Sequence, residues 1–338
     1  MKTFLYGAYG TGNLGDDALL KSALECYGTR DTIAICYKKP FLEQEVNWIE
    51  HFDFIKNPEK YLNKGDELIY AGGGLFWTSS HADDMLHIAQ AANKKSCKIV
   101  VDRIGAQGVH CNLEAAKSLF DLCESISFRD KASVDLVRQL GLTEIGIAKC
   151  DLAMSINNLP IDSYFETESF KIGINHSATP FFYNKEHQEK TLHIYNEITN
   201  HCPDVEFYHI PHTRHFNVIS QNDVINGEYF WKFSGGRIES IPFPNTVEEL
   251  LSIYGSINGF IGWRYHMMVL ATLMGKPAAH LGQLGGHKYG AFANEHKLPQ
   301  INFDAPTANI VSSAVKFIRM VEQGEATIAK PLISPKSK

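Results

Sequence analysis

An arginine and a histidine two residues apart are the strongest candidates for chemistry in this chain. Arg264 and His266 follow an apolar run, residues 258–262, and open a second apolar stretch, residues 265–274. This order predicts a strand that leads into a buried helix, with both side chains at the helix N-terminus. The dipole and backbone N–H groups there attract anions, and a histidine titrates near neutral pH. The segment therefore predicts an anion pocket with a proton-transfer group beside it.

Two aspartates provide the second candidate. Asp16 and Asp17 end a glycine-rich loop, residues 10–17, whose three glycines match the spacing of a dinucleotide-binding fingerprint. Two carboxylates at the start of the following helix would repel a pyrophosphate. The next expected strand, residues 32–37, ends in two lysines and lacks the acidic residue that binds an NAD ribose. Lysines suit a 2′-phosphate, so NADP stays open as a minor alternative.

Further basic side chains stand at the expected ends of strands. Arg129 follows residues 125–128 and offers a rigid fork of donors to a carboxylate or phosphate, although a surface ion pair explains it equally well. Lys288 is flanked by glycines and can reach a phosphate as a point charge, although a solvated surface lysine is commoner. Both residues are candidates for anion binding.

Three histidines recur at every third position over residues 209–215. Pro211 excludes a helix there, and the run contains no carboxylate, so a metal site is a minor alternative. The preferred interpretation places His212, just after a strand, in a ligand cleft.

A run of three glycines follows the expected strand at residues 67–71. Gly73 and Gly74 would let a ligand or an opposing domain approach the backbone closely. A tight strand-to-helix turn is the alternative.

These candidates fall on a regular alternation of apolar runs and amphipathic segments. The expected strands are residues 3–7, 32–37, 67–71, 98–102, 125–128, 145–148, 170–174, 205–210, 237–241, 258–262 and 278–281. The expected helices are residues 17–27, 82–93, 112–122, 130–140, 184–200, 246–255, 265–274 and 307–322. The alternation predicts two doubly wound, Rossmann-like α/β domains that face a cleft. We expect them at residues 1–160 and 168–325, with a flexible tail at 326–338.

The composition excludes several classes of protein. A hydrophobic content of 44% with 21% charged residues is typical of a globular chain, and a net charge of −6 argues against nucleic-acid binding. The seven cysteines are scattered without a Cys-x-x-Cys pair, which indicates a reducing compartment and no zinc site. The chain has no apolar run of about 20 residues, and its start leads directly into a strand. We expect a cytoplasmic protein without a signal peptide.

Taken in order, these motifs resemble the polysaccharide pyruvyl transferase family. The matching parts are Gly10 through Asp17, Gly72-Gly73-Gly74, Phe128-Arg129-Asp130 with Ser133, Asp151, Ile210-Pro211-His212, Arg264-x-His266 and Gly275-x-Pro277. They extend over nearly the whole chain. Trp263 departs from the small residue that the family usually has before the arginine, and the loop before Lys288 is longer than usual.

The resemblance implies a GT-B-like fold and transfer of a pyruvyl group from phosphoenolpyruvate to two hexose hydroxyls, which forms a cyclic ketal. The acceptor would be a lipid-linked precursor of a cell-surface polysaccharide, at the inner face of the membrane, with at most peripheral membrane contact. No metal or cofactor is implied. The implied catalytic residues are His266, Asp17 and Asp16; the donor-binding residues are Arg129, Arg264, His212 and Lys288; the acceptor or backbone-contact loops contain Gly12, Asn13, Gly15, Gly73 and Gly74.

Two other functions stay open. A GT-B-type glycosyltransferase would use the same helix N-terminus and arginine for the diphosphate of a nucleotide-sugar. A non-catalytic glycan-binding protein would have no need of an anion pocket, which makes it the weaker alternative.

Overall fold

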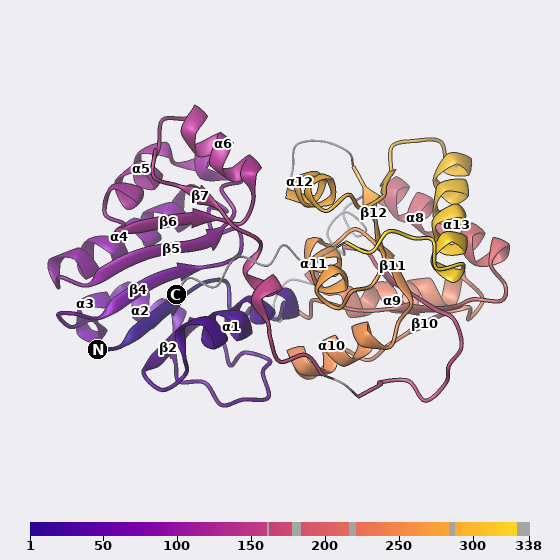
Figure 1. Ribbon diagram of the computed structural model, residues 1–338, viewed down its shortest axis with the longest axis horizontal. Helices are drawn as coiled ribbons and strands as arrows, with labels where there is room; N and C mark the ends of the chain where they lie inside the picture. The colour runs from indigo at the N-terminus through magenta and orange to yellow at the C-terminus, as the bar shows by residue number, and fades with distance from the viewer. Residues whose placement is uncertain (161, 178–183, 216–220, 284–287, 330–338) are drawn as a thin grey trace. The chain divides into compact units, whose positions relative to one another are not determined.

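The chain forms two compact units in the computed structural model, which describes residues 1–160, 162–177, 184–215, 221–283 and 288–329 (Figure 1). The N-terminal unit consists of residues 1–11 and 16–157. The C-terminal unit consists of residues 158–329 together with Gly12–Gly15, the tip of the glycine-rich loop. The sequence did not indicate that this short segment belongs with the second half of the chain.

A seven-stranded parallel sheet forms the centre of the N-terminal unit, in the order β3-β2-β1-β4-β5-β6-β7. Strand addition reverses between β1 and β4, so this pair is the topological switch point of the sheet. Four consecutive residues of β4, Leu68 to Ala71, are buried, as expected for a parallel strand covered on both faces. The strands are β1 (Thr3–Tyr6), β2 (Thr32–Cys36), β3 (Trp48–Glu50), β4 (Glu67–Ala71), β5 (Lys98–Ile104), β6 (Ser125–Phe128) and β7 (Ile147–Ala148).

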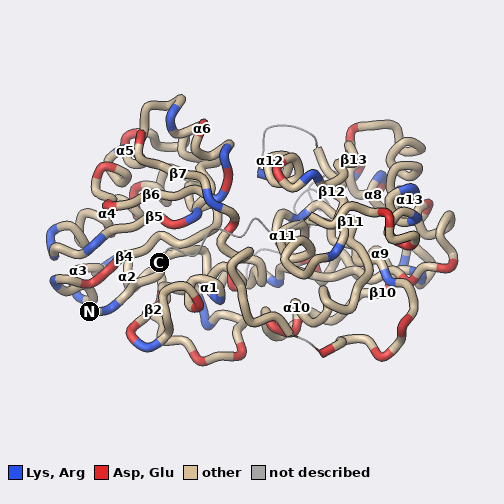
Figure 2. Tube along the Cα trace, in the orientation of Figure 1, with Lys and Arg blue, Asp and Glu red and all other residues tan. Residues whose placement is uncertain are grey.

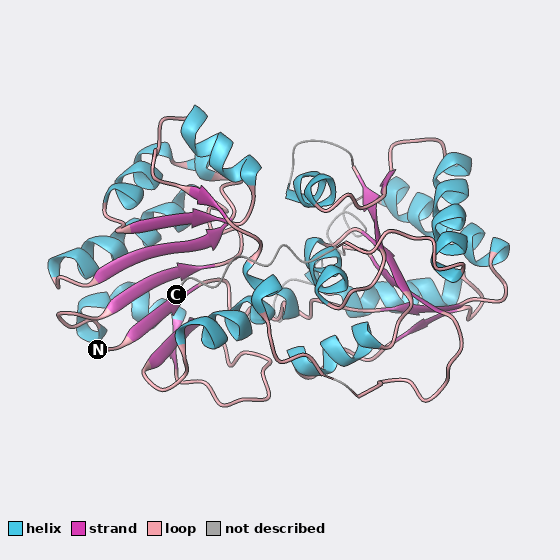
Figure 3. Ribbon diagram, viewed as in Figure 1, coloured by secondary structure: helices cyan, strands magenta, loops and turns pink. Residues whose placement is uncertain are grey.

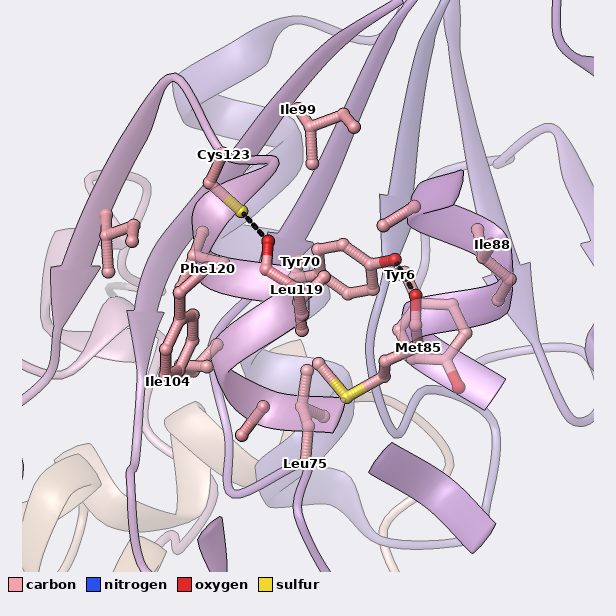
Figure 4. Packing of buried hydrophobic residues seen from close by; sticks show 14 of the residues in the cluster. Tyr6, Tyr70, Leu75, Met85, Ile88, Ile99, Ile104, Leu119, Phe120 and Cys123 are labelled. Atoms are coloured by element: carbon pink, nitrogen blue, oxygen red, sulfur yellow. Dashed lines mark hydrogen bonds between the residues drawn. The ribbon is translucent and has the colours of Figure 1, made fainter. Parts of the chain in front are cut away.

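Helices cover both faces of this sheet (Figure 3). On one face, α4 packs against α3 and α5, and their apolar side chains meet those of the strands. Figure 4 shows this core, in which the Tyr70 hydroxyl donates to the Met85 carbonyl at 2.6 Å and the Tyr70 ring lies 5.3 Å from that of Tyr6. The helices are α1 (Leu14–Tyr27), α2 (His51–Lys56), α3 (Pro58–Tyr61), α4 (Ser79–Lys94), α5 (Leu113–Asp121) and α6 (Lys131–Gln139), with 3₁₀ turns η1 (Val109–Cys111) and η2 (Leu152–Ser155).

The C-terminal unit repeats this plan with a six-stranded parallel sheet in the order β10-β9-β8-β11-β12-β13. Its switch point lies between β8 and β11. The strands are β8 (Lys171–Asn175), β9 (Glu206–His209), β10 (Ile238–Ser240), β11 (Gly259–Gly262), β12 (Ala278–Gly282) and β13 (Gln300–Asn302). The helices are α8 (Lys185–His201), α9 (Asp223–Phe233), α10 (Val247–Gly255), α11 (Tyr265–Leu273), α12 (Lys288–Glu295) and α13 (Thr307–Glu322).

The predicted fold class of two doubly wound α/β domains is confirmed. The expectation that α11 is buried is also confirmed, because all of its residues except His266 are buried. Acidic and basic residues are interspersed in both units (Figure 2), without the basic surplus of a nucleic-acid-binding surface. In the part of the chain that the structure describes, none of the helices combines the length and hydrophobicity needed to cross a bilayer.

Candidate functional site

The switch point of the C-terminal sheet positions the strongest candidates. Ligands of doubly wound sheets bind beyond the carboxyl ends of the strands at such a point. β8 and β11 lie side by side there, and the Trp263 N–H donates to the Asn175 carbonyl at 2.8 Å. A Cβ on Gly262 would lie 2.3 Å from that carbonyl oxygen, so only glycine permits this approach. Arg264 and His266 follow directly.

Arg264 is held by a buried carboxylate that the sequence did not reveal as its partner. Its Nη2 atom lies 2.5 Å from Oδ1 of Asp223, whose side chain is fully buried at the first position of α9. The Arg264 side chain keeps 18% of its surface exposed. A carboxylate is favoured at a helix N-terminus, so the position of Asp223 stabilises both its own charge and that of the guanidinium. The ion pair fixes the direction of the arginine.

The second oxygen of Asp223 organises the loop after β9. Oδ2 accepts hydrogen bonds from the backbone N–H groups of His212 and Thr213, each at 3.1 Å. One buried carboxylate therefore connects Arg264 to the segment that carries His212. Because charged hydrogen bonds are stronger than neutral ones, this connection holds the two candidates in a fixed arrangement.

His212 is neutral near pH 7. Its ring is fully buried, and Nε2 lies 2.7 Å from the hydroxyl of Tyr254. Burial, with a smaller contribution from the charge of Arg264, lowers the pKa of His212 to about 3. His212 thus adds no positive charge to the site, and its part in donor binding stays a prediction. Burial likewise lowers the pKa of His209 to about 3.

The loop segment 12–15 lies against these residues within the C-terminal unit. Leu14 N–H donates to the His212 carbonyl at 2.9 Å, and Arg214 N–H donates to the Gly12 carbonyl at 2.8 Å. A Cβ on Gly15 would stand 2.2 Å from Nδ1 of His266, so the absence of a side chain makes room for that ring. The glycine therefore sets the position of the predicted proton-transfer group.

Two other predicted residues of this loop have defined places. Asn13 forms an isolated antiparallel bridge with Thr213, and its Oδ1 accepts from Gly15 N–H at 3.0 Å. Gly12 has a φ of +90°, and a Cβ there would lie 2.4 Å from the Arg214 carbonyl oxygen. Both residues contact the backbone of the two residues that follow His212, Thr213 and Arg214.

Lys288 begins α12 and lies near the start of α11. Its Nζ is 5.7 Å from the ring centre of Tyr265 and 5.2 Å from that of Tyr289. Because Tyr265 stands between Arg264 and His266, this contact brings a second cation to the same helix terminus. Cation–π contact leaves the ammonium able to accept an anion.

The N-terminal unit contains the remaining candidates. Asp17 is fully buried, and its two oxygens accept hydrogen bonds from the backbone N–H groups of Gly10 at 2.8 Å and Phe41 at 2.9 Å. Burial raises the pKa of Asp17 to about 6, although the two N–H donors act in the opposite direction. These contacts give Asp17 a structural task in the loop. Its part in catalysis stays a prediction.

Asp16, Gly73 and Gly74 gather with a glycine that sequence reasoning did not single out. A Cβ on Gly73, whose φ is +75°, would lie 3.9 Å from Oδ1 of Asp16. The Gly73 carbonyl accepts from Gly105 N–H at 2.7 Å, and Gly74 forms a bridge with Gly105. Asp16 therefore lies near the carboxyl ends of β4 and β5.

Arg129 is buried beside this group. Its Nη2 donates to Oε1 of Gln107 at 2.6 Å, and its Nε lies 3.3 Å from Oδ2 of Asp130. A Cβ on Gly105 would lie 2.4 Å from Nη2, so the glycine leaves the space that the guanidinium occupies. Arg129 is only 3% exposed, which excludes the alternative of a surface ion pair. Its role in donor binding stays a prediction.

Comparison with known proteins identifies the family. A family model described as polysaccharide pyruvyl transferase matches residues 13–283. The chain belongs to the polysaccharide pyruvyl transferase family. The match covers most of the chain and includes the segments that carry Arg129, His212, Arg264 and His266. No curated protein gives a significant match.

Solved structures share the GT-B-like architecture of this family member. The UDP co-structure of MnaA from S. aureus is 13% identical with a TM-score of 0.67, over 98% of this chain and 92% of that one. UDP-GlcNAc 2-epimerase from Neisseria meningitidis, bound to UDP-GlcNAc, is 12% identical with a TM-score of 0.65, over 98% and 95%. At these identities the likeness concerns the fold alone.

Proposed function

We propose that this pyruvyl transferase family member moves a pyruvyl group from phosphoenolpyruvate onto two hydroxyls of a hexose in a cell-surface polysaccharide precursor. The observation that supports it best is Arg264, oriented by buried Asp223, at a helix N-terminus beside His266. Phosphoenolpyruvate carries a phosphate and a carboxylate, and its binding calls for fixed cations and N–H groups. The cytoplasmic side of the membrane, where a lipid-linked acceptor would be presented, is the proposed place of action.

Arg264 and Lys288 are the proposed cations for the donor. The guanidinium can bind two oxygens of one phosphate or carboxylate at once, whereas the ammonium acts as a point charge. Neutral, fully buried His212 is kept as a predicted donor-binding residue. Arg129, buried in the N-terminal unit, is kept as a predicted donor-binding residue.

His266 is the proposed general acid. One acceptor hydroxyl adds to C2 of the enol while C3 gains a proton and becomes a methyl group. The second hydroxyl then replaces the phosphate at C2, so the products are the cyclic ketal and inorganic phosphate. The two hydroxyls release two protons in total: one balances the proton gained by C3, and the other leaves with phosphate. A histidine is suited to deliver the first of them near neutral pH.

Asp16 is the proposed acceptor-side base. It is half-buried near Gly73, whereas both oxygens of its neighbour Asp17 bind backbone N–H groups. An acceptor hydroxyl can reach a half-buried carboxylate more readily than a fully buried one. We therefore favour Asp16 over Asp17 for this role.

The deciding experiment supplies phosphoenolpyruvate and lipid extracts from the host, and measures inorganic phosphate together with the mass increment of one pyruvyl ketal. Wild-type protein should release phosphate only when both substrates are present, and His266→Ala should release almost none. Thermal shifts with phosphoenolpyruvate and with UDP- and GDP-sugars test the donor separately. Stabilisation by a nucleotide-sugar alone, with no phosphate release, would replace the proposal with a glycosyltransferase.

A further inference from the structure

We infer that Arg103, which is buried in the N-terminal unit, is a positioning residue for Arg129. Arg103 holds a bulge in β5 that turns Gly105 toward the Arg129 guanidinium. The inference rests on the proposed function and deepens it, because Arg129 is a predicted donor-binding residue there.

Arg103 has a backbone conformation that a residue with a side chain rarely adopts. Its φ is +56° within β5, and the residue is only 7% exposed. In the described part of the chain, the other two non-glycine residues with a positive φ, Ser96 and Lys297, are exposed turn residues. In a buried strand this conformation persists only where the surrounding contacts enforce it, and such strain is concentrated at functional sites.

The strained residue coincides with a bulge in the strand. β5 pairs with β6 at Val101 and again at Ile104, and between these pairs β5 carries one residue more than β6. An extra residue reverses the alternation of all side chains that follow it. The bulge therefore decides that Ile104 faces the core shown in Figure 4 and that Gly105 faces Arg129.

The residues after the bulge form the surroundings of Arg129. The Arg129 N–H donates to the Ile104 carbonyl at 3.0 Å, and a Cβ on Gly105 would lie 2.4 Å from Nη2 of Arg129. The Gly105 N–H donates to the Gly73 carbonyl at 2.7 Å, which fixes the glycine in this place. A straight strand would put a neighbour of Gly105, with its side chain, on this face, and the guanidinium would lose its space.

A buried ion pair holds the bulge. Nε of Arg103 donates to Oδ2 of Asp102 at 3.1 Å, and Nη1 donates to Oγ of Ser155 at 2.5 Å. The Arg103 N–H donates to Oγ of Ser127 at 3.0 Å, and that hydroxyl donates to Oδ1 of Asp102 at 2.8 Å. Although burial opposes its charge, Arg103 and Lys149 lower the pKa of Asp102. A buried polar network of this kind rigidifies its surroundings and fixes one local arrangement.

Two variants at this position separate the backbone from the side chain. Arg103→Ala and Arg103→Gly both remove the guanidinium, but only glycine adopts a positive φ without strain. In Arg103→Ala we expect the Arg129 Nε–H signal of the ¹⁵N-labelled full chain to shift, and phosphoenolpyruvate binding in calorimetry to weaken by about tenfold. In Arg103→Gly the signal should stay near its wild-type position and the affinity within about threefold. Arg129→Lys identifies the signal by its loss.

Two further variants separate positioning from a general loss of structure. Tyr70→Phe removes a buried hydrogen bond from the core of the same unit, and it should lower the melting temperature but leave the Arg129 signal and the affinity unchanged. Ser127→Ala removes the acceptor of the Arg103 N–H and keeps the ion pair. It should shift the Arg129 signal in the same direction as Arg103→Ala, and it carries the test if Arg103→Ala does not fold.

A double variant tests whether Arg103 acts through Arg129. In an Arg129→Ala background, Arg103→Ala should cause no further loss of phosphoenolpyruvate affinity. Three results would overturn the inference: an unchanged Arg129 signal in Arg103→Ala and Ser127→Ala, equal effects of Arg103→Ala and Arg103→Gly, and additive losses in the double variant. If the wild-type protein does not bind phosphoenolpyruvate, the proposed function fails, while the Arg129 signal still tests the inference.

Discussion

Lowering the pH from 7.5 to 5 should destabilise the C-terminal unit far more than the N-terminal unit. Burial lowers the pKa of His209 and His212 to about 3 and that of His280 to about 4. In the unfolded chain these imidazoles titrate near pH 6.5. Between their folded and unfolded pKa values the unfolded state binds more protons, so stability falls as the pH falls through 6.5.

The size of the effect follows from the same values. One pKa unit corresponds to about 1.4 kcal/mol, and pH 5 lies about 1.5 units below the unfolded pKa of histidine. Each buried histidine therefore lowers the free energy of unfolding by about 2 kcal/mol at pH 5. The pKa in the folded state has little influence on this figure, since it lies below pH 5 for all three histidines. The three histidines together remove about 6 kcal/mol, a large part of the stability of an ordinary domain. Burial also lowers the pKa of His176, which adds in the same direction.

The N-terminal unit contains a compensating pair. His51 has a pKa of about 4 in the folded state, so it lowers the free energy of unfolding by about 2 kcal/mol between pH 7.5 and 5. Asp17, with a pKa raised to about 6, acts in the opposite direction, because the folded state binds a proton at a higher pH than the unfolded state does. Its protonation raises the free energy of unfolding by about 1.4 kcal/mol at pH 5. The net change is below about 1 kcal/mol. This unit should therefore respond weakly to acid.

Urea unfolding followed by tryptophan fluorescence separates the two units. Trp48 and Trp77 report the N-terminal unit, and Trp231 and Trp263 report the C-terminal unit, so each pair is replaced by phenylalanine in turn. The urea midpoint reported by the C-terminal tryptophans should fall steeply at pH 5. His209→Asn should reduce the loss of unfolding free energy between pH 7.5 and 5 by about 2 kcal/mol, the contribution of one histidine. A C-terminal midpoint that is constant from pH 7.5 to 5 would refute the reasoning, because the buried imidazoles would then not titrate as argued.

Three further predictions concern the site. Gly15→Ala should displace the His266 ring, since the new Cβ would lie 2.2 Å from Nδ1 of that ring. The folded variant should show a kcat for phosphate release that is lower by about 10²-fold or more, and an unchanged kcat would contradict the placement of His266. His266→Ala should lower kcat by about 10²–10⁴-fold with near-normal phosphoenolpyruvate affinity by calorimetry, whereas Arg264→Lys should weaken that affinity. Equal losses of kcat and affinity in His266→Ala would make His266 a binding residue. Asp17→Asn should lower the free energy of unfolding by about 1–3 kcal/mol in urea titrations, because one of the two N–H partners of Asp17 loses its acceptor. Asp16→Asn should lower turnover without this loss of stability, and a loss of turnover in Asp17→Asn alone would show that Asp17 is the base.

Much of the fold could be predicted because periodicity and local caps carry it. Asp130 and Thr246 stand directly before helices α6 and α10, and their side chains accept from Ser133 N–H and Glu249 N–H. The short strands β3 and β13 were not predicted, since three residues give no measurable period. Helix α9 was also missed: Gly227, a poor helix former, lies in its middle, and its aromatic residues are spread around the helix without a clear apolar face.

The candidate site was predicted only where one segment carries the signal. Arg264 and His266 share a strand-to-helix junction, so their spacing was enough to single them out. Asp223 lies 41 residues from Arg264 at the start of the helix that was missed, and no local pattern connects the two. The contact of Gly15 with His266 likewise joins opposite ends of the sequence, and only the folded chain brings them together.

Asp223 explains how an arginine can stand at the start of α11. The N-terminus of a helix carries a partial positive charge, so a guanidinium there is repelled unless a carboxylate offsets it. Asp223 supplies that carboxylate from the first turn of α9, where its own charge is favoured, and its second oxygen binds two backbone N–H groups. The carboxylate balances the guanidinium, while the dipole of α11 and Lys288 still favour an anion. The proposed donor would therefore meet an arginine whose direction is already set, and little ordering of that side chain would remain to oppose binding.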